Sequence, residues 1–300
     1  MADIRFDDQV VIVTGAGGGL GRAHALEFAR RGAKVVVNDL GGSVDGSGGS
    51  SEAAQKVVAE IEAAGGAAIA NGSSVTDDAG VAHMVRQTLD AFGRIDVLIA
   101  NAGILRDKSF SKMELEDFTK VVDVHLVGSV KCAKAVWETM RAQNYGRIVV
   151  TTSSSGLYGN FGQSNYGAAK LALVGLMNTL KLEGQKNDVR VNAISPVAAT
   201  RMTENIGIPP QIMEMLKPEL VTPGVVYLAS RDAPNGVILT AGAGVFAQAK
   251  IVETEGVALG PSASAEGVRD AFATIQDASN AQAYFTGNEQ TQKFMRLLMG

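Results

Sequence analysis

This 300-residue chain is poor in cysteine and in charge, and each shortage excludes a class of protein. Its one cysteine, Cys132, permits no intrachain disulfide, so a disulfide scaffold is excluded and a reducing compartment is favoured. Lysine plus arginine number 27 against 31 aspartate plus glutamate, with no basic run, so no nucleic-acid partner is expected. No group of histidine, cysteine and acidic residues has ligand spacing, so no metal is expected.

The two ends of the chain and its apolar runs lack the marks of an address or a membrane anchor. The start, MADIRFDDQ, is acidic, and the apolar run Val10–Val13 after it is too short for a signal peptide. The end, Leu297-Leu298-Met299-Gly300, is not a peroxisomal Ser-Lys-Leu signal. No stretch reaches the ~18 apolar residues of a membrane span. We therefore expect a cytoplasmic protein with no membrane partner.

Glycine is abundant, at 35 residues, and short β-branched apolar runs alternate with helical stretches. Most of the runs are continuous, which is typical of strands that are covered on both faces. The expected strands are residues 10–14, 34–38, 67–71, 95–100, 147–152, 189–194 and 237–240. The expected helices are residues 20–31, 50–64, 77–92, 114–141, 165–184 and 222–230, with weaker ones near 264–279 and 288–298.

The alternation of strand and helix predicts the fold class. We expect an α/β fold with a doubly wound, mostly seven-stranded parallel sheet of the Rossmann-like type, in a single domain. Residues 1–245 are expected to form the dinucleotide-binding and catalytic domain, and residues 246–300 a C-terminal extension packed on it. In such a sheet the carboxyl ends of the strands lie on one edge, where ligands bind.

The first expected strand runs into a glycine-rich turn, TGAGGGLG, which spans residues 14–21 and precedes a helix. Its spacing is TGxxxGxG, through Gly15, Gly19 and Gly21, rather than GxGxxG. Glycines permit a tight turn and a close backbone approach, and the helix N-terminus offers free N–H groups to a pyrophosphate. The turn, with Leu20 inside it, therefore predicts a dinucleotide site.

The second expected strand ends in VVVND, so that Asp39 comes 18 residues after Gly21. An acidic side chain there can accept hydrogen bonds from the adenosine ribose, and it repels a 2′-phosphate. No lysine or arginine in the turn before Gly19 offsets that repulsion. Asp39 therefore favours NAD over NADP. The alternative is that Asp39 is only a turn residue before Gly41 and Gly42.

Three polar residues follow the fifth expected strand at a spacing that suits acid–base chemistry. Ser153 comes at the end of that strand, Tyr166 follows 13 residues later, and Lys170 lies at i+4 on the same helix face. A phenol with a pKa near ~10 is a poor acid–base group at neutral pH, and a nearby ammonium would lower that pKa. Tyr166 is therefore the candidate acid–base residue, and Ser153 can hold a substrate oxygen.

The chain resembles the short-chain dehydrogenase/reductase family over about residues 8–245. The resemblance rests on the TGxxxGxG turn, on Asn101-Ala102-Gly103 after the fourth strand, and on Ser153 with Tyr166-x-x-x-Lys170. The resemblance implies that Tyr166 is the general acid/base and that Ser153 positions the substrate oxygen. It implies that Lys170 binds the nicotinamide ribose and tunes Tyr166.

The same resemblance implies a cofactor site along the sheet edge. Asn101 would stabilise that edge, Ser74-Val75 would border the adenine, and the segment from Pro196 to Thr200 would contact the carboxamide. The expected cofactor is NAD. The expected cofactor-binding residues are Gly15, Gly19, Leu20, Gly21, Asp39, Ser74, Val75, Asn101, Ala102, Gly103, Tyr166, Lys170, Pro196 and Thr200.

Two positions depart from the family pattern. The family often has asparagine on the long central helix, where it completes a proton relay, and the matching position here is His125. A histidine could relay protons through water, so His125 joins the candidate catalytic residues, although it could equally be a packed helix residue. The usual Pro-Gly after the sixth strand is Pro196-Val197 here.

A closer resemblance rests on VNDLGG at residues 37–42, NAGILRD at 101–107 and GLYGNFGQ at 156–163. These segments resemble the (3R)-hydroxyacyl-CoA dehydrogenase domain of peroxisomal multifunctional β-oxidation enzymes and its standalone bacterial relatives, which act on acyl-CoA or steroid substrates. The implied reaction transfers a hydride between C3 of a (3R)-hydroxyacyl-CoA and NAD. The alternatives are a hydroxysteroid or general alcohol dehydrogenase or carbonyl reductase, and, in another class, a non-catalytic NAD-binding regulator.

Three further segments carry weaker expectations. Residues 200–220, which include three methionines, could form a lid over an apolar chain or merely pack a surface helix. The family resemblance implies a homodimer or homotetramer, with the helices 114–141 and 165–184 as the interface. The sequence assigns no chemical role to the Gly/Ser-rich loop at residues 41–51.

Overall fold

The structure is a computed structural model that describes residues 3–199 and 214–299. Contacts divide the chain into two compact units, residues 1–248 and 249–300. The first unit contains the sheet and the candidate site. The packing of the C-terminal residues on the same domain stays a prediction.

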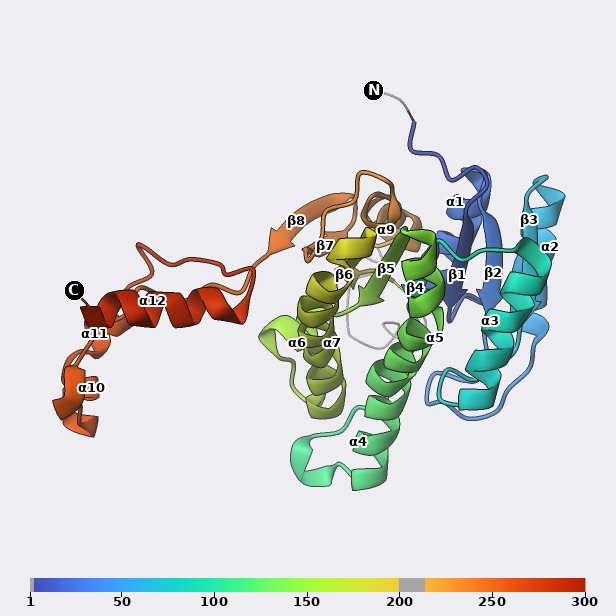
Figure 1. Ribbon diagram of the computed structural model, residues 1–300. Coiled ribbons are helices and arrows are strands. Elements are labelled where there is room, and N and C mark those ends of the chain that lie inside the picture. Colours follow the sequence, from blue (N-terminus) through green and yellow to red (C-terminus); the bar gives the residue numbers. More distant parts are fainter. Residues whose placement is uncertain (1–2, 200–213, 300) are drawn as a thin grey trace. The chain divides into compact units, whose positions relative to one another are not determined.

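The first unit is built on one sheet with the strand order β3-β2-β1-β4-β5-β6-β7-β8 (Figure 1). The strands up to β7 pair in parallel, which confirms the predicted doubly wound sheet. Because β1 lies between β2 and β4, the order of connection reverses there, and such a reversal opens a crevice at the carboxyl edge. The bounds are β1 (Val10–Thr14), β2 (Lys34–Asn38), β3 (Ala67–Asn71), β4 (Val97–Ala100), β5 (Gly146–Thr151), β6 (Val189–Val197) and β7 (Ile238–Gly242).

The sheet has one strand more than the seven expected. β8 (Val245–Ala249) follows β7 after the turn Ala243–Gly244, whose two φ angles, 50° and 76°, are positive. So short a connection joins antiparallel strands. Most of β8 is exposed, so this edge strand lacks the buried apolar run by which the other strands were predicted.

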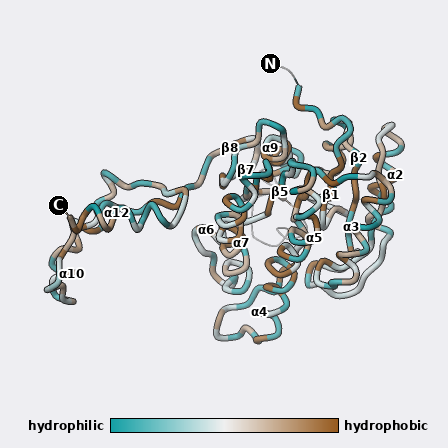
Figure 2. The backbone as a smooth tube through the Cα atoms, viewed as in Figure 1, coloured by the Kyte–Doolittle hydropathy of each residue, from teal (hydrophilic) through white to brown (hydrophobic). Residues whose placement is uncertain are grey.

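Helices cover both faces of the sheet (Figure 1). On one face α1 (Gly19–Arg30) contacts α2 (Glu52–Ala63) and α9 (Thr222–Ala229). The other face carries α3 (Asp78–Phe92), α5 (Gly128–Gln143) and α7 (Ser164–Glu183). Because both faces are covered, all five residues of β1 are buried, and Figure 2 shows hydrophobic chain at β1 and β2. The shorter segments of this unit are η1 (Phe110–Lys112), α6 (Ser154–Tyr158), η3 (Gln185–Asn187) and η4 (Pro218–Leu220).

The helix expected over residues 114–141 contains one wider turn. α4 (Leu115–Val122) continues through a π-helical turn, η2 (Asp123–Val127), into α5. A π turn inside an α-helix is frequently found at a functional site. His125 lies in this turn and is buried.

The second unit consists of short helices and connecting loops. Its elements are η5 (Gly260–Ser262), α10 (Ala265–Asp270), α11 (Phe272–Ile275) and α12 (Gly287–Met299). Lys293 of α12 forms an ion pair with Glu253 and donates a 2.9 Å hydrogen bond to the Thr254 carbonyl. Glu253 also pairs with Gln282 in an antiparallel bridge. These contacts attach α12 to the first residues of the unit.

Candidate active site

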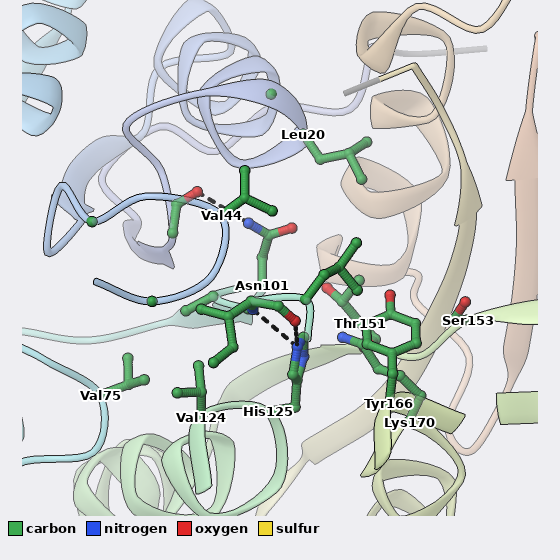
Figure 3. A pocket seen from close by; sticks show the side chains of 18 of the residues that line it. Leu20, Val44, Val75, Asn101, Val124, His125, Thr151, Ser153, Tyr166 and Lys170 are labelled. Carbon is green, nitrogen blue, oxygen red and sulfur yellow. Dashed lines mark hydrogen bonds between the residues drawn. The ribbon is translucent and has the colours of Figure 1, made fainter. Parts of the chain in front are cut away.

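A cavity of about 380 Å³ lies at the carboxyl edge of the sheet. Its size falls in the range of small-molecule and cofactor sites. Figure 3 shows Ser153, Tyr166 and Lys170 together on one side of it and Val75 on the other. The predicted residues that line it are Gly15, Gly19, Leu20, Asp39, Ser74, Val75, Asn101, Ala102, Gly103, His125, Ser153, Tyr166, Lys170 and Pro196. Gly21 lies behind this wall, and Thr200 lies outside the described residues.

The glycine turn between β1 and α1 forms one wall of the cavity. Gly15 has a φ of +65°, and a Cβ there would lie 2.7 Å from the Cα of Ala102. A Cβ on Gly21 would overlap the carbonyl oxygen of Gly15. The N-terminus of α1 has no side-chain cap at Gly18. Its amides therefore remain available to a phosphate, as the spacing predicts.

Asn101 ties β4 to the glycine turn. Its Nδ2 donates hydrogen bonds of 3.1 Å to the carbonyl oxygens of Thr14 and Gly15. In return, the Thr14 hydroxyl accepts bonds from the amides of Asn101 and Ala102, at 3.0 and 3.1 Å. This network holds the turn against the neighbouring strand end.

Asp39 lies directly after β2 and faces the same cavity. Its Oδ2 accepts the Gly17 amide at 2.7 Å, and its Oδ1 accepts the Gly41 amide at 2.6 Å. The carboxylate is therefore fixed between the glycine turn and the following loop. The structure shows the turn contact that the sequence offered as the alternative, and it places the carboxylate at the cavity wall, whereas binding of the ribose stays a prediction.

Three of the four candidate catalytic residues lie after β5 and on α7. Ser153 follows β5 and caps the N-terminus of α6, where its side chain accepts the Ser155 amide at 3.2 Å. Tyr166 and Lys170 lie one turn apart on α7, with the Lys170 Nζ 5.4 Å from the centre of the Tyr166 ring. The same Nζ donates a 2.5 Å hydrogen bond to the Thr151 carbonyl. The structure thus brings the predicted set together.

Burial controls the protonation of this set. It lowers the pKa of Lys170 from 10.5 to about 7, because the ammonium loses its hydration. Burial also raises the pKa of Tyr166, and a hydrogen bond with Ser153 partly offsets that rise. The pKa of Tyr166 thus shifts upward where the sequence led us to expect a decrease, because burial of the phenol outweighs the hydrogen bond with Ser153.

His125 packs against Tyr166 and against the segment after β4. The two rings meet edge to face, with centroids 5.0 Å apart. His125 Nε2 lies 3.0 Å from the amide nitrogen and 2.8 Å from the carbonyl oxygen of Ile104 (Figure 3). Burial, and then the charge of Lys170, lower its pKa well below 6.5, so the ring is neutral. Its Nδ1 has no hydrogen-bond partner among the described residues.

Gly103 explains how an imidazole fits at this place. A Cβ on Gly103 would overlap the His125 ring. The two predicted residues are therefore sterically paired, which their separation of 22 residues in the chain does not indicate. His125 remains a candidate for the proton relay.

The remaining predicted residues complete the cavity wall. Ser74 and Val75 follow β3, and Val75 is buried against α5 at Gly128. Pro196 lies within β6, which extends through Val197 and pairs with β7. Pro196-Val197, which stands where the family usually has Pro-Gly, therefore forms regular β-strand.

The predicted lid, residues 200–220, is only partly described. Residues 200–213 lie outside the described residues. Of the rest, Leu216 is buried and lines the cavity, whereas Met215 is exposed. The Ala199 amide donates a 2.5 Å hydrogen bond to the Leu216 carbonyl.

Sequence reasoning missed two parts of the wall. Gly42, Ser43, Val44 and Gly46 of the 41–51 loop line the cavity, although no chemistry was assigned to them. Gln163 does too, with its Oε1 accepting the Ser155 hydroxyl at 2.6 Å. The segment 37–42, used for the closer resemblance, ends at this loop, and the segment 156–163 contains Gln163. These two segments were the sequence feature that could have pointed to this part of the wall.

Three further features concern residues 3–199 and 214–299. These residues contain no group of three or more histidine, cysteine or acidic side chains that could hold a metal. Cys132 is buried on α5, as expected, and burial raises its thiol pKa to about 12. Within the same described residues, no helix is long and apolar enough to cross a membrane.

The family model for short-chain dehydrogenases matches residues 9–209, which include the glycine turn, Asn101, Ser153, Tyr166 and Lys170. The chain belongs to the short-chain dehydrogenase family. It is 50% identical over 299 residues to the peroxisomal multifunctional enzyme type 2 of Mus musculus, covering 98% of this chain and 40% of the mouse protein. It is 49% identical over 276 residues to a putative short-chain type dehydrogenase/reductase of Mycobacterium tuberculosis, covering 92% of this chain and 96% of that protein.

Solved structures agree with this membership. Full-length peroxisomal multifunctional enzyme type 2 from Drosophila melanogaster aligns with a TM-score of 0.83 at 39% identity, covering 99% of this chain and 50% of that one. The chain therefore spans half or less of the length of these two multifunctional relatives. A 7α-hydroxysteroid dehydrogenase complexed with NADH aligns with a TM-score of 0.72 at 27% identity, covering 81% and 98%.

Family membership makes the chain an oxidoreductase with a nicotinamide cofactor. The residues present fit that cofactor. The glycine turn leaves no room for side chains beside Gly15, and the Asp39 carboxylate faces the same cavity. The Tyr166 and Lys170 pair lines this cavity on the side away from Val75 (Figure 3).

Proposed function

We propose that this short-chain dehydrogenase interconverts a (3R)-3-hydroxyacyl-CoA and the 3-ketoacyl-CoA with NAD as its cofactor. The observation that carries the proposal is the convergence of Ser153, Tyr166 and Lys170 on one cavity with the glycine turn and Asp39. These residues supply an oxygen holder, an acid–base group and a dinucleotide cradle in a single space.

The chain's own residues account for the proton part of the reaction. In oxidation, Ser153 holds the substrate hydroxyl, and Tyr166 takes the hydroxyl proton on its phenolate oxygen as the C–O bond becomes a carbonyl. A nicotinamide cofactor held beside Tyr166 and Lys170 would supply the acceptor for the hydride from the same carbon. Lys170, anchored to the Thr151 carbonyl, is placed to orient the cofactor ribose and to stabilise the phenolate. Reduction runs the same transfers backwards.

The acyl-CoA substrate is supported by the wall beside the catalytic residues. Val197, Ala198 and Leu216 are apolar and suit an acyl chain, whereas Asn160 and Gln163 are polar and suit a thioester. The peroxisomal multifunctional relatives support the same class. A steady-state screen of NAD and NADP against short and long 3-hydroxyacyl-CoA esters, a steroid alcohol and simple secondary alcohols tests it. Turnover of the secondary alcohols alone would contradict the proposal.

Tyr166→Phe tests the acid–base assignment. Loss of a positioned proton donor should lower kcat by about a hundredfold to ten-thousandfold. The Kd for NADH, measured by fluorescence titration, should stay within about threefold of wild type, since the aromatic ring remains. This is less than the tenfold change in Kd that a loss of about 1.4 kcal/mol of binding free energy would cause. Near-wild-type turnover would remove Tyr166 from the mechanism.

Asp39→Asn tests the preference for NAD. The change keeps the size and one acceptor oxygen for the neighbouring amides but removes the charge that repels a 2′-phosphate. We expect the ratio of kcat/KM for NAD over NADP to fall by about tenfold, or ~1.4 kcal/mol. Unchanged selectivity would leave Asp39 with only its turn role.

A hydroxysteroid is the second candidate substrate. The structural likeness to a 7α-hydroxysteroid dehydrogenase favours it, and the same screen decides between the two. Higher kcat/KM for the steroid alcohol than for every acyl-CoA ester would select this alternative.

We further propose a homodimer or homotetramer in the cytoplasm. Exposed apolar side chains on the expected interface helices, Val130 on α5 and Leu171 on α7, support the oligomer. The single cysteine supports a reducing compartment. Sedimentation velocity and cell fractionation test these two points.

A further inference from the structure

The Gly/Ser-rich loop between β2 and α2, residues 41–50, has a defined shape and borders the cavity. The Ser50 amide donates to the Leu40 carbonyl at 2.8 Å, which closes the base of the loop. Inside it, the Ser43 amide donates to the Ser47 carbonyl, also at 2.8 Å. Hydrogen bonds from the Ser43 and Ser47 side chains and the Ser47 amide lower the pKa of Asp45 to about 2. The loop is therefore an ordered wall rather than a loose tether.

The loop is attached to the segment that follows β4. The Leu105 amide donates to the Val44 carbonyl at 2.9 Å, and Arg106 Nε donates to the Asp45 carbonyl at 2.9 Å. A Cβ on Gly46 would lie 3.1 Å from the Ile104 side chain, so the two chains approach closely there. Loop and segment thus form one continuous side of the cavity.

Arg106 connects this side to two other parts of the site. Its Nη1 pairs with Asp117 of α4 at 2.8 Å, and Asp117 also pairs with Lys108. The Arg106 carbonyl accepts the Asn165 Nδ2 at 2.9 Å, and the Asn165 Oδ1 accepts the Tyr166 amide at 2.7 Å. One residue therefore contacts the loop, α4 and the start of the catalytic helix.

We propose that residues 41–50 form a clasp over the Asp39 end of the cofactor and that Arg106 is the positioning residue that latches it. The proposal rests on the proposed placement of the adenosine ribose at Asp39. The latch is a guanidinium bond to a carbonyl, stronger than a neutral bond because the donor is charged. Its loss frees the loop to open and speeds release of the dinucleotide.

Arg106→Gln and Lys108→Gln form a matched pair for the test. Both remove a positive charge beside Asp117, but only Arg106 bonds the loop through its side chain. We expect Arg106→Gln to raise the NADH dissociation rate constant at least tenfold in stopped-flow displacement and to raise KM for NAD without lowering kcat. Lys108→Gln should stay within twofold of wild type.

Binding and exchange measurements separate the clasp from a merely structural role. ADP-ribose, which lacks the nicotinamide, should lose affinity for Arg106→Gln by the same factor as NADH in calorimetry. In hydrogen exchange, NADH should protect peptides covering residues 41–50 in wild type, and less so in the variant. A chain in which one glycine replaces residues 43–47 should release NADH as fast as the Arg106→Gln variant. Adding Arg106→Gln to this shortened chain should not increase the NADH release rate further.

Three outcomes would overturn the proposal. An unchanged NADH dissociation rate in a folded Arg106→Gln variant would exclude the latch. If that variant fails to fold, unchanged release from the loop-shortened chain would exclude the clasp. Failure of ADP-ribose to displace NADH from wild type would instead overturn the adenosine placement at Asp39, with the reaction itself still testable through Tyr166→Phe.

Discussion

Replacing Lys170 with methionine is expected to stabilise the folded chain while it abolishes turnover. Lys170 is 3% exposed, and burial lowers its pKa from 10.5 to about 7. The folded state therefore disfavours the ammonium that the unfolded chain carries at neutral pH. Methionine has a similar length and no charge to desolvate, so it removes this destabilising contribution.

The size of the effect follows from the pKa change. Each pKa unit is about 1.4 kcal/mol, so the buried lysine costs about 4 kcal/mol at pH 7. The variant also loses the hydrogen bond to the Thr151 carbonyl, and an unsatisfied carbonyl costs about 1–3 kcal/mol. The free energy of unfolding of Lys170→Met should therefore exceed that of wild type by roughly 1–3 kcal/mol at pH 7.

The pH dependence gives the sharper test. Between the folded pKa of about 7 and the unfolded value of 10.5, the unfolded wild-type chain binds the extra proton at Lys170. Wild-type stability from this group therefore rises with pH, by roughly 1 kcal/mol per unit, and the variant lacks that rise. Its advantage is largest at or below pH 7 and shrinks toward pH 9.

Urea unfolding of both proteins at pH 7, 8 and 9, at one protein concentration, measures this difference. Lys134→Met, which removes an exposed lysine of α5, is the control and should change stability by less than about 0.5 kcal/mol at each pH. A Lys170→Met protein that is less stable than wild type at pH 7, by an amount independent of pH, would refute the burial argument.

Substitutions at Gly21 and Gly103 test the close approaches at the site, and a substitution at Gly175 is the control. Gly21→Ala should abolish NADH binding, measured by fluorescence, because the added Cβ overlaps the Gly15 carbonyl. Gly175→Ala lies in open space on α7, so its free energy of unfolding, measured in urea, should rise by up to about 1 kcal/mol. Wild-type NADH affinity in Gly21→Ala would refute the tight turn. Gly103→Ala should lower the melting temperature, because the added Cβ overlaps the His125 ring. The double variant with His125→Ala should recover the melting temperature, and independent effects of the two changes would show that these residues do not contact.

Much of the sheet could be predicted because each parallel strand is a continuous apolar run. β1 and β2 begin and end at the residues that the pattern indicated, since burial on both faces leaves little ambiguity in such runs, and the bounds of the edge strand β3 match as well. β8 was missed for the opposite reason, because an exposed edge strand carries no such run. The short helix α6 was also missed, since its five residues are too few for a helical period to show.

The candidate site divides in the same way. Gly15, Asp39, Ser153, Tyr166 and Lys170 could be found because their spacing places them at strand ends and on one helix face. The direction of the Tyr166 pKa shift could not be predicted, because it depends on how deeply the phenol is buried in the folded chain.

The sequence by itself determined the α/β order of elements and the positions of the glycine turn and of Ser153, Tyr166 and Lys170 along it, because local spacing and apolar periodicity encode them. Only the tertiary structure decided which distant groups touch. His125 meets Gly103 and Tyr166 through a π turn, and Arg106 reaches the loop at 41–50 across the cavity edge. Such contacts join segments far apart in the chain, and their distances follow from packing rather than from local sequence pattern.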